Sequence, residues 1–462
     1  MNVCVDFYGM EEFRMERGTF FHSVTLDREK CHGCINCVKR CPTEAIRVRN
    51  GKAQIITERC IDCGECIRVC PHHAKQATFD SFSAIDRFPY KVALPAPALY
   101  GQFNNLDDVD PVIGALELMG FDEVFEVARA AELVSDATRR YMAGFQVRRP
   151  VISSACPAVL RLIRVRFPEL LDNILPMHAP IEVAARLAKR EAAAKTGLPP
   201  EQIGAFFISP CPAKVTAVKM PLGTEKSSVD GVLAIREVYP RLISLMKDVP
   251  VSAGELSGAG RMGIGWGSSG GEAAAALRER YLAADGIENV IRVLEDLEDE
   301  KFYDLDFVEL NACSGGCVGG VLNVENPYVA RAKLKRIRKY RPVSCNRLPD
   351  DDLSPYQWDL AVQYEPVLEL DANLKAAMEK MRQMHEIEER LYGMDCGSCG
   401  APSCKALAED VVRGFAEENA CIFKLRDEMR AMADGLTRLA RALPRASNSE
   451  DSRENSEKEK SR

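Results

Sequence analysis

Between about residues 90 and 365, short apolar segments alternate with longer segments whose apolar residues recur at helical spacing. This alternation is typical of an α/β fold, and in open α/β sheets the ligand-binding loops follow the strands. We predict strands at Lys91–Leu94, Pro150–Ile152, Ala205–Ile208 and Asp306–Leu310, and helices at Ile181–Lys195 and Glu272–Ala283. An earlier strand is predicted at Phe20–Leu26.

The pattern changes towards the C-terminus. Residues 370–391 predict one connecting helix with a packing face, because its apolar residues are spaced by threes and fours. These residues are Leu374, Met378, Met381, Met384, Ile387 and Leu391. Residues 405–429 also predict a helix, whereas after about Leu443 the chain is rich in Ser, Glu and Lys and is expected to be disordered.

Composition narrows the class of protein. The 462 residues are enough for two to four domains of roughly 100–200 residues each, and a hydrophobic content of 46% supports a large core. A net charge of −7 argues against a nucleic-acid partner. No apolar run approaches the roughly 18 residues that span a bilayer, and residues 1–14 lack the order of a signal peptide. We therefore expect a cytoplasmic protein.

The chain has 18 cysteines, and they are grouped. Eight lie between Cys31 and Cys70, four between Cys396 and Cys421, and four in three short segments with Gly or Pro. Structural disulfides are rare in the cytoplasm. Grouped thiolates instead suit iron–sulfur clusters or zinc.

Residues 31–46 and 60–75 are an internal repeat with the pattern C-x-x-C-x-x-C-x-x-x-C-P. The pattern resembles bacterial two-cluster ferredoxins, in which the fourth cysteine of each run binds the other cluster. The resemblance implies two [4Fe-4S] clusters, one on Cys31, Cys34, Cys37 and Cys70 and the other on Cys60, Cys63, Cys66 and Cys41. Zinc is the alternative, but it usually takes two separated pairs of ligands.

Three loops carry the next four cysteines. They are Ser153–Pro157 with Cys156, Ser209–Lys214 with Cys211, and Glu309–Gly320 with Cys313 and Cys317. Separated loops of this kind can together hold one further cubane, and the adjacent prolines and glycines would fix the loops and let the backbone approach an inorganic ligand.

These loops, in this order, resemble the catalytic domain of [FeFe] hydrogenases over about residues 90–365, which implies a two-lobed α/β domain. In that family the cysteines matching Cys156, Cys211, Cys313 and Cys317 bind a [4Fe-4S] cubane. The cysteine matching Cys317 also bridges to a diiron subsite with CO, cyanide and azadithiolate ligands, which completes the H-cluster. Lys214 matches the lysine that donates to a cyanide ligand.

The departures from the family pattern concern proton transfer. Ala155 replaces a cysteine that relays protons, and a methyl group cannot do so. Ala217 replaces a glutamate, and Asn311 replaces a methionine. Retained ligands with lost relay groups resemble the sensory type of [FeFe] hydrogenase, particularly the group with a C-terminal cysteine motif.

The spacing of Cys396, Cys399, Cys404 and Cys421 is similar to small [4Fe-4S] domains of corrinoid iron–sulfur proteins and electron-transport subunits. Zinc is the alternative here too, since one set of four cysteines also suits a tetrahedral ion.

The expected organisation has six parts. They are an N-terminal arm (1–22), a ferredoxin-like α+β module (23–85), the H-cluster domain (90–365), a linker helix (370–391), a helical [4Fe-4S] domain (392–443) and a disordered tail (444–462).

The expected function is slow, reversible H2 oxidation and proton reduction used to sense hydrogen or redox state. The expected partners are H2 and protons, a redox protein such as ferredoxin, a signalling kinase or phosphatase, and hydrogenase maturation proteins. One alternative is a scaffold without the diiron subsite that serves in iron–sulfur delivery or electron relay. Another is a competent enzyme with a different proton route.

Overall fold

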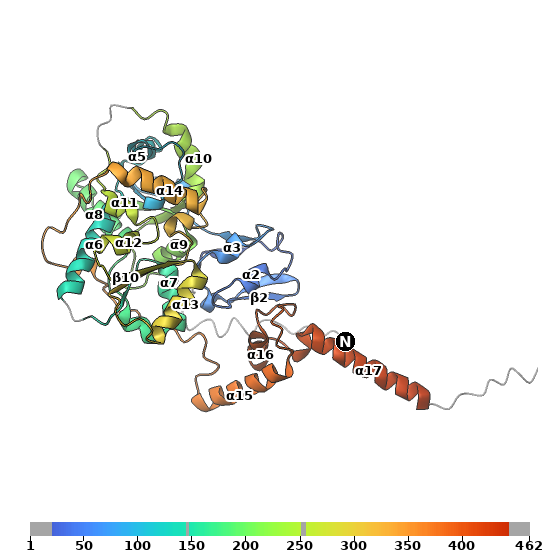
Figure 1. Cartoon of the computed structure of the whole chain (residues 1–462). Coiled ribbons are helices and arrows are strands. Elements are labelled where there is room, and N and C mark those ends of the chain that lie inside the picture. Colours follow the sequence, from blue (N-terminus) through green and yellow to red (C-terminus); the bar gives the residue numbers. More distant parts are fainter. Residues whose placement is uncertain (1–20, 145–146, 251–255, 443–462) are drawn as a thin grey trace, which may run out of the picture. The chain divides into compact units, whose positions relative to one another are not determined.

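The computed structural model describes residues 21–144, 147–250 and 256–442 (Figure 1). The chain forms two compact units, the first ending at Glu369 and the second beginning at Leu370. Most of the expected N-terminal arm and all of the expected tail lie outside the described residues. Within the described ranges, no helix is both long and apolar enough to cross a membrane.

The first unit begins with a small α+β module that contains the cysteine repeat. Two antiparallel pairs frame it: β1 (Val24–Leu26) with β4 (Lys75–Ala77), and β2 (Ile46–Arg49) with β3 (Lys52–Ile55). In each repeat the third cysteine lies on a one-turn helix, α2 (Asn36–Lys39) or α3 (Glu65–Arg68). The repeated sequence therefore folds into two similar halves.

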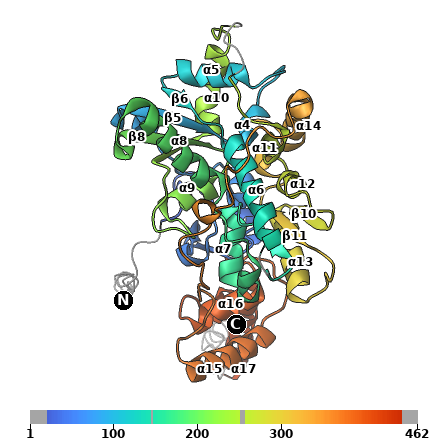
Figure 2. The same cartoon turned by 90° about the vertical axis from the view of Figure 1, so that its left-hand side faces the viewer.

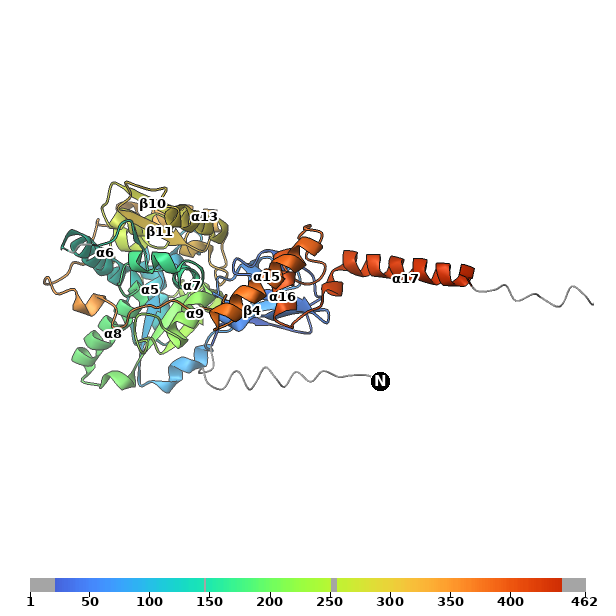
Figure 3. The ribbon, with the colours of Figure 1, turned by 90° about the horizontal axis from the view of Figure 1, so that it is seen from below.

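The rest of the first unit is an α/β domain with two lobes (Figures 2 and 3). One lobe has the parallel sheet β6 (Glu123–Val124), β5 (Tyr90–Pro95), β8 (Ile203–Ser209) and β9 (Gly231–Ala234). The other has the parallel sheet β10 (Tyr281–Asp285), β11 (Phe307–Asn311) and β7 (Val151–Ile152). The α/β class and the four central strands predicted from the sequence are confirmed.

Alternating residues of the larger sheet enter two separate cores. Val92 and Phe207 belong to a core shared with α6 (Val127–Gly144) and α8 (Pro180–Thr196). Ala93 and Phe206 belong to a core shared with α5 (Asp110–Leu118) and α10 (Ile235–Leu245). Both faces of the sheet are covered, which explains why β8 is buried throughout and reads as a continuous apolar run.

Each of the three cysteine loops follows a parallel strand. The loop with Cys156 follows β7 and leads into α7 (Pro157–Arg166), and the loop with Cys211 follows β8 and leads into α9 (Pro212–Lys219). The loop with Cys313 follows β11. The carboxyl ends of parallel strands are where α/β sheets bind ligands.

The predicted helix at Glu272–Ala283 is wrong in its second half. Helix α12 spans only Gly271–Ala275, and the chain then enters β10. Leu277 has a positive φ of 52°, which a continuing helix cannot contain. Pairing of β10 with β11 along five residues overrides the helical preference of the alanines.

The second unit contains three longer helices, α15 (Leu374–Arg390), α16 (Cys404–Val412) and α17 (Ile422–Ala442). Its core joins Met384, Ile387 and Leu391 to Ala406 and Leu407. The predicted helix at 370–391 is present, but only the second half of its apolar stripe is buried. Its first half, Leu374, Met378 and Met381, is exposed.

The predicted single helix at 405–429 is also wrong. Helix α16 ends at Val412, and Gly414, with φ of 78°, turns the chain away. Cys421 precedes α17 in an extended conformation, so it does not approach the other cysteines from within a helix.

Glu132 on α6 is a buried anchor for two segments of the first unit. Its carboxylate accepts backbone hydrogen bonds from Gly260 (2.9 Å), Cys345 (2.9 Å) and Asn346 (2.9 Å).

Glu132→Gln replaces one acceptor oxygen by a donor facing N–H groups, and we expect the free energy of unfolding to fall by about 2–3 kcal/mol. Thermal unfolding of the anaerobic protein measures it. Glu191→Gln, at an exposed position on α8, is the control, and an equal melting temperature for both variants would contradict this role.

Candidate functional site

Three loops meet in the first unit at the carboxyl ends of its strands. Leu322, beyond the third loop, donates its N–H to the Pro210 carbonyl oxygen of the second at 2.9 Å. A Cβ on Gly320 would lie 2.2 Å from that oxygen, so this approach requires glycine. The third loop also contacts the segment before α12, because Val318 donates its N–H to the Gly267 carbonyl at 2.9 Å.

These loops bring together Cys156, Cys211, Cys313 and Cys317. Burial raises the pKa of Cys211 to about 11 and that of Cys317 to about 12, and the negative charge of neighbouring thiolates contributes to both shifts. Burial, followed by the charges of Cys211 and Cys156, raises the pKa of Cys313 well above its usual range. Each thiol is close enough to interact electrostatically with the other three.

Lys214 lies beside these four thiols. It is in the first turn of α9 and is 8% exposed. Its ammonium donates a hydrogen bond to the Ala155 carbonyl oxygen at 3.2 Å. Its charge opposes the effect of burial on the pKa of Cys211 and Cys317. A buried cation therefore faces the cysteine set from the side of Ala155.

A pair of buried carboxyl groups that sequence reasoning missed continues from Ala155. The Ala155 N–H donates to the Ser153 Oγ at 3.2 Å, and the Ser153 hydroxyl donates to the Glu272 Oε2 at 2.6 Å. The Asn311 Nδ2 donates to Glu309 at 2.8 Å. Burial raises the pKa of both Glu272 and Glu309, and for Glu272 the charge of Glu309 adds to the shift. Burial and this neighbouring charge together favour the protonated form of the Glu272 carboxyl group.

The first ferredoxin-type set lies around Cys37. Burial raises the pKa of Cys37 to about 11, and the charges of Cys34, Cys70 and Cys31 contribute in the same direction. Burial would also raise the pKa of Cys70, but backbone N–H donors nearby lower it overall. Cys70 comes from the second repeat and is nevertheless a neighbour of the first, as the ferredoxin pattern predicts.

The second set is assembled in the same crosswise manner. Burial raises the pKa of Cys66 to about 12, with Cys41 among the neighbouring charges. Burial also raises the pKa of Cys60 and Cys63, and Cys41 again contributes to both. Cys41, from the first repeat, therefore lies with the three cysteines of the second.

Asp62 joins this second set to the α/β domain. Its buried carboxylate accepts hydrogen bonds from the Val24 N–H at 2.9 Å and the Thr216 hydroxyl of α9 at 2.8 Å. The Ser23 hydroxyl donates to the Pro212 carbonyl at 2.8 Å. Asp62 is two residues from Cys60, so one buried network connects this loop with the helix that carries Lys214.

The α3 side of the module contacts the third cysteine loop. The Arg68 guanidinium donates to the Gly319 carbonyl at 2.7 Å, and its charge lowers the pKa of Cys313 against the dominant effect of burial. A Cβ on Gly64 would lie 2.8 Å from Val321. The second ferredoxin-type set and the loop cysteines therefore lie on segments that pack directly against each other.

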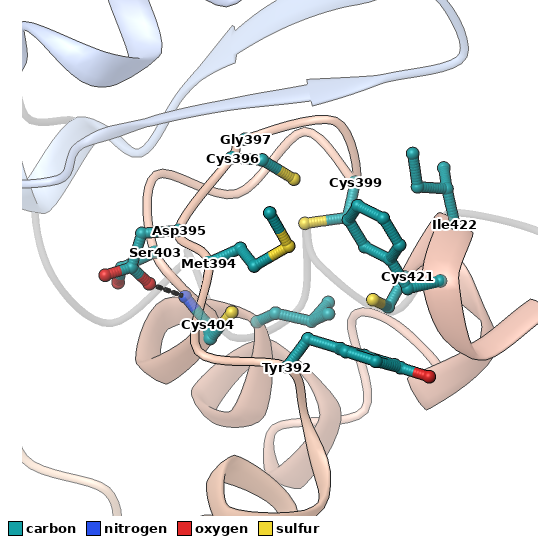
Figure 4. A pocket seen from close by; sticks show the side chains of 12 residues that line it. Tyr392, Met394, Asp395, Cys396, Gly397, Cys399, Ser403, Cys404, Cys421 and Ile422 are labelled. Atoms are coloured by element: carbon teal, nitrogen blue, oxygen red, sulfur yellow. Dashed lines mark hydrogen bonds between the residues drawn. The ribbon is translucent and has the colours of Figure 1, made fainter.

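In the second unit, four cysteines line one cavity (Figure 4). These four are Cys396, Cys399, Cys404 and Cys421. The Cys404 N–H donates to Asp395 at 2.6 Å, which holds the start of α16 against the loop with Cys396. The side chains of Tyr392, Met394, Leu407, Ile422 and Phe423 also line this space.

Sulfur spacing distinguishes a single ion from a cluster. A tetrahedral zinc ion with bonds of about 2.3 Å holds its sulfurs about 3.8 Å apart. Over the described ranges, the one group of three or more His, Cys, Asp or Glu with ligand atoms all within 4.8 Å of each other is His22, Cys60 and Asp62. No three sulfurs of a predicted cysteine set, in either unit, have the spacing of a single-ion site.

The family models match these parts of the chain. Residues 90–284 and 271–321 match the iron only hydrogenase large subunit, C-terminal domain, and residues 23–71 match a 4Fe-4S dicluster domain. A third model, for an Fe-S cluster domain, matches residues 391–423.

Three similar proteins illustrate the distance to known relatives. Iron hydrogenase 1 of Clostridium pasteurianum is 27% identical over 68% of this chain and 68% of its own length. The periplasmic [Fe] hydrogenase large subunit of Nitratidesulfovibrio vulgaris is 25% identical over 65% of this chain and 86% of its own. A solved [FeFe]-hydrogenase of Chlamydomonas reinhardtii has 16% identity and a TM-score of 0.45, covering 60% of this chain and 95% of that one.

The hydrogenase model spans half of the chain and includes all three cysteine loops. The protein is an iron–sulfur protein of the α/β class with [4Fe-4S] domains. It belongs to the [FeFe]-hydrogenase large-subunit family and carries an N-terminal ferredoxin module.

Proposed function

We propose that this protein converts H2 and protons slowly at an H-cluster and that its redox state serves as a signal of hydrogen or of reducing power. One observation carries the proposal: four cysteines converge beside Lys214, and the Lys214 ammonium donates to the carbonyl oxygen of Ala155, the residue before Cys156. H2, protons and a ferredoxin-type electron partner are part of the same proposal, as are a signalling partner and maturation proteins.

The proposed ligand sets follow the neighbourhoods of the thiols. Cys31, Cys34, Cys37 and Cys70 would hold one cubane, Cys60, Cys63, Cys66 and Cys41 a second, Cys156, Cys211, Cys313 and Cys317 a third, and Cys396, Cys399, Cys404 and Cys421 a fourth. Buried thiols with raised pKa are neutral without metal, and iron cations replace their protons on binding. The donor chemistry fits such clusters.

Cys317 and Lys214 would also hold the diiron group, the first through its sulfur and the second through a charge-assisted hydrogen bond to a cyanide. When bound, this group supplies the site at which H2 is formed and cleaved. The protein contributes a buried cation whose ammonium already contacts the first loop. The remaining requirement is a supply of protons.

Protons would move through groups other than residue 155. The Ala155 methyl group cannot carry one. The Ser153 hydroxyl can, because it hydrogen-bonds the Glu272 Oε2 at 2.6 Å and can donate and accept. Glu272 would hold a proton at neutral pH, with Glu309 behind it. The Ser153 hydroxyl contacts the backbone N–H of Ala155, but it does not occupy the place of a relay side chain at residue 155. A less direct proton route of this kind supports low turnover.

Infrared spectroscopy tests for the diiron group. The full chain, reconstituted anaerobically with iron and sulfide and then supplied with the diiron cofactor, is expected to show CO and cyanide stretching bands. Cys317→Ser should abolish them, because the bridging sulfur is lost, whereas Cys345→Ser, at an exposed cysteine outside all four sets, should retain them. If the wild type shows no bands, the scaffold with cubanes alone replaces this proposal.

Two substitutions test the proton route in the loaded protein. Ala155→Cys restores a titratable group beside the cysteine set and should raise H2 turnover by about 10-fold or more. Glu272→Gln keeps the shape of the side chain but cannot release a carboxyl proton, and should lower turnover by about 10-fold or more. Glu117→Gln, at an exposed position, is the control. Unchanged rates in both test variants would rule out this route.

Metal analysis tests the C-terminal set. Four cubanes correspond to about sixteen iron atoms in the protein without the diiron group. The double change Cys396→Ser and Cys421→Ser should remove about four iron atoms per chain and leave zinc unchanged, because the proposed cubane contains four iron atoms. The Cys345→Ser variant should keep the full iron content. Loss of one zinc ion with no loss of iron would show that the site is a zinc site.

A further inference from the structure

Helix α17 carries an apolar stripe with a strict repeat. Its residues are Ile422, Leu425, Met429, Met432, Leu436 and Leu439, separated by three, four, three, four and three positions. This is the a and d pattern of a coiled-coil heptad, whose mean period is 3.5 residues. The sequence continues the same spacing at Leu443.

The described part of the chain does not bury this stripe. No residue of α17 is buried along its 21 positions. The exposed fraction of the stripe rises from 44% at Leu425 to 68% at Leu436. By contrast, α15 and α16 bury apolar side chains against each other. An isolated amphipathic helix gains most of its stability from packing its apolar face, so this one requires a partner.

The form of the stripe indicates the kind of partner. A helix that packs on a globular core has a broad apolar face, with a third position in each heptad. In α17 no e or g position flanking the seam of a and d residues holds a large apolar residue, and the positions on the outer face are mostly charged or polar, including Lys424, Asp427, Arg430, Asp434 and Arg438. At about 31 Å the helix is three heptads long, which is sufficient for a short coiled coil.

The flanks of the seam are compatible with a second copy of the same helix. The flanking e and g positions, which select partners, are Arg426, Glu428, Ala433, Gly435, Ala440 and Ala442. In a parallel pair in register, Glu428 of one helix faces Ala433 of the other, while Arg426 lies at the start of the seam and faces no charge. In an antiparallel pair both residues face small neutral residues. No like charges meet, and the helix has no row of charges that would select a different protein.

We propose that α17 pairs with the α17 of a second copy of this chain in a two-helix coiled coil. The stripes of the two helices then cover each other, which removes six exposed apolar side chains per chain from water. This pairing does not depend on the hydrogen chemistry proposed above, because its consequence is an oligomeric state.

Mass measurement of the full chain tests the proposal. Sedimentation or light scattering at increasing micromolar concentrations should show a dimer. Leu436→Glu places a charge in the seam and should weaken dimerisation by at least about 100-fold. Thr437→Glu adds the same charge one residue away on the outer face and should leave the dimer intact. The Leu436 side chain lies outside the core, so both variants should fold, which the iron content confirms.

Each other outcome contradicts the pairing. A wild-type chain that remains monomeric at 100 μM means that the seam takes a different occupant. A dimer that persists equally in Leu436→Glu and in Met432→Glu places the interface elsewhere. A dimer lost in Thr437→Glu as well would mean that the added charge, and not the seam, controls association.

Discussion

Burial of sulfur donors is the constraint on which the arrangement of the first unit depends. Four thiols from three loops lie close together, and their ionised forms are unfavourable there without a cation. Burial raises the pKa of Cys313 and Cys317, and each added thiolate charge raises the pKa of the others. Lys214 carries a single positive charge, so it can offset no more than one thiolate charge among the four cysteines. Iron ions in the same space would neutralise several thiolate charges, which is why we propose an inorganic cluster there.

Direct packing holds the ferredoxin-like module against the α/β domain. Asp62 and Arg68 each lie close to a cysteine of the second ferredoxin-type set, and each contacts an element that carries the loop cysteines. The Asp62 contact is a buried hydrogen bond and the Arg68 contact a partly buried one, and together they fix the distance between the two cysteine groups. A flexible linker would let that distance vary. The module is therefore built into the domain, and its strand β1 is held by the same network.

Much of this could be predicted from the sequence because the chemistry is encoded locally. The spacing around Cys31 and Cys60 predicts the crosswise sets, and the apolar runs predict the central strands. Asp62 and Glu272 could not be found this way, because their importance comes from Thr216 and Ser153, which are distant in sequence. The helix expected at 272–283 failed for a related reason, since the pairing of β10 is a long-range contact.

The differences from the family pattern fall on the proton side of the site. The cysteines and Lys214 that would hold the proposed cofactor are retained, while Ala155 stands where the family resemblance implies a relay cysteine. Asn311, another departure, donates to Glu309 and so joins the buried carboxyl pair. If protons reach the proposed cofactor only through buried carboxyl groups, each turnover waits for a slow proton transfer even when electrons arrive quickly. Slow turnover of this kind is the reason why we propose signalling rather than bulk turnover.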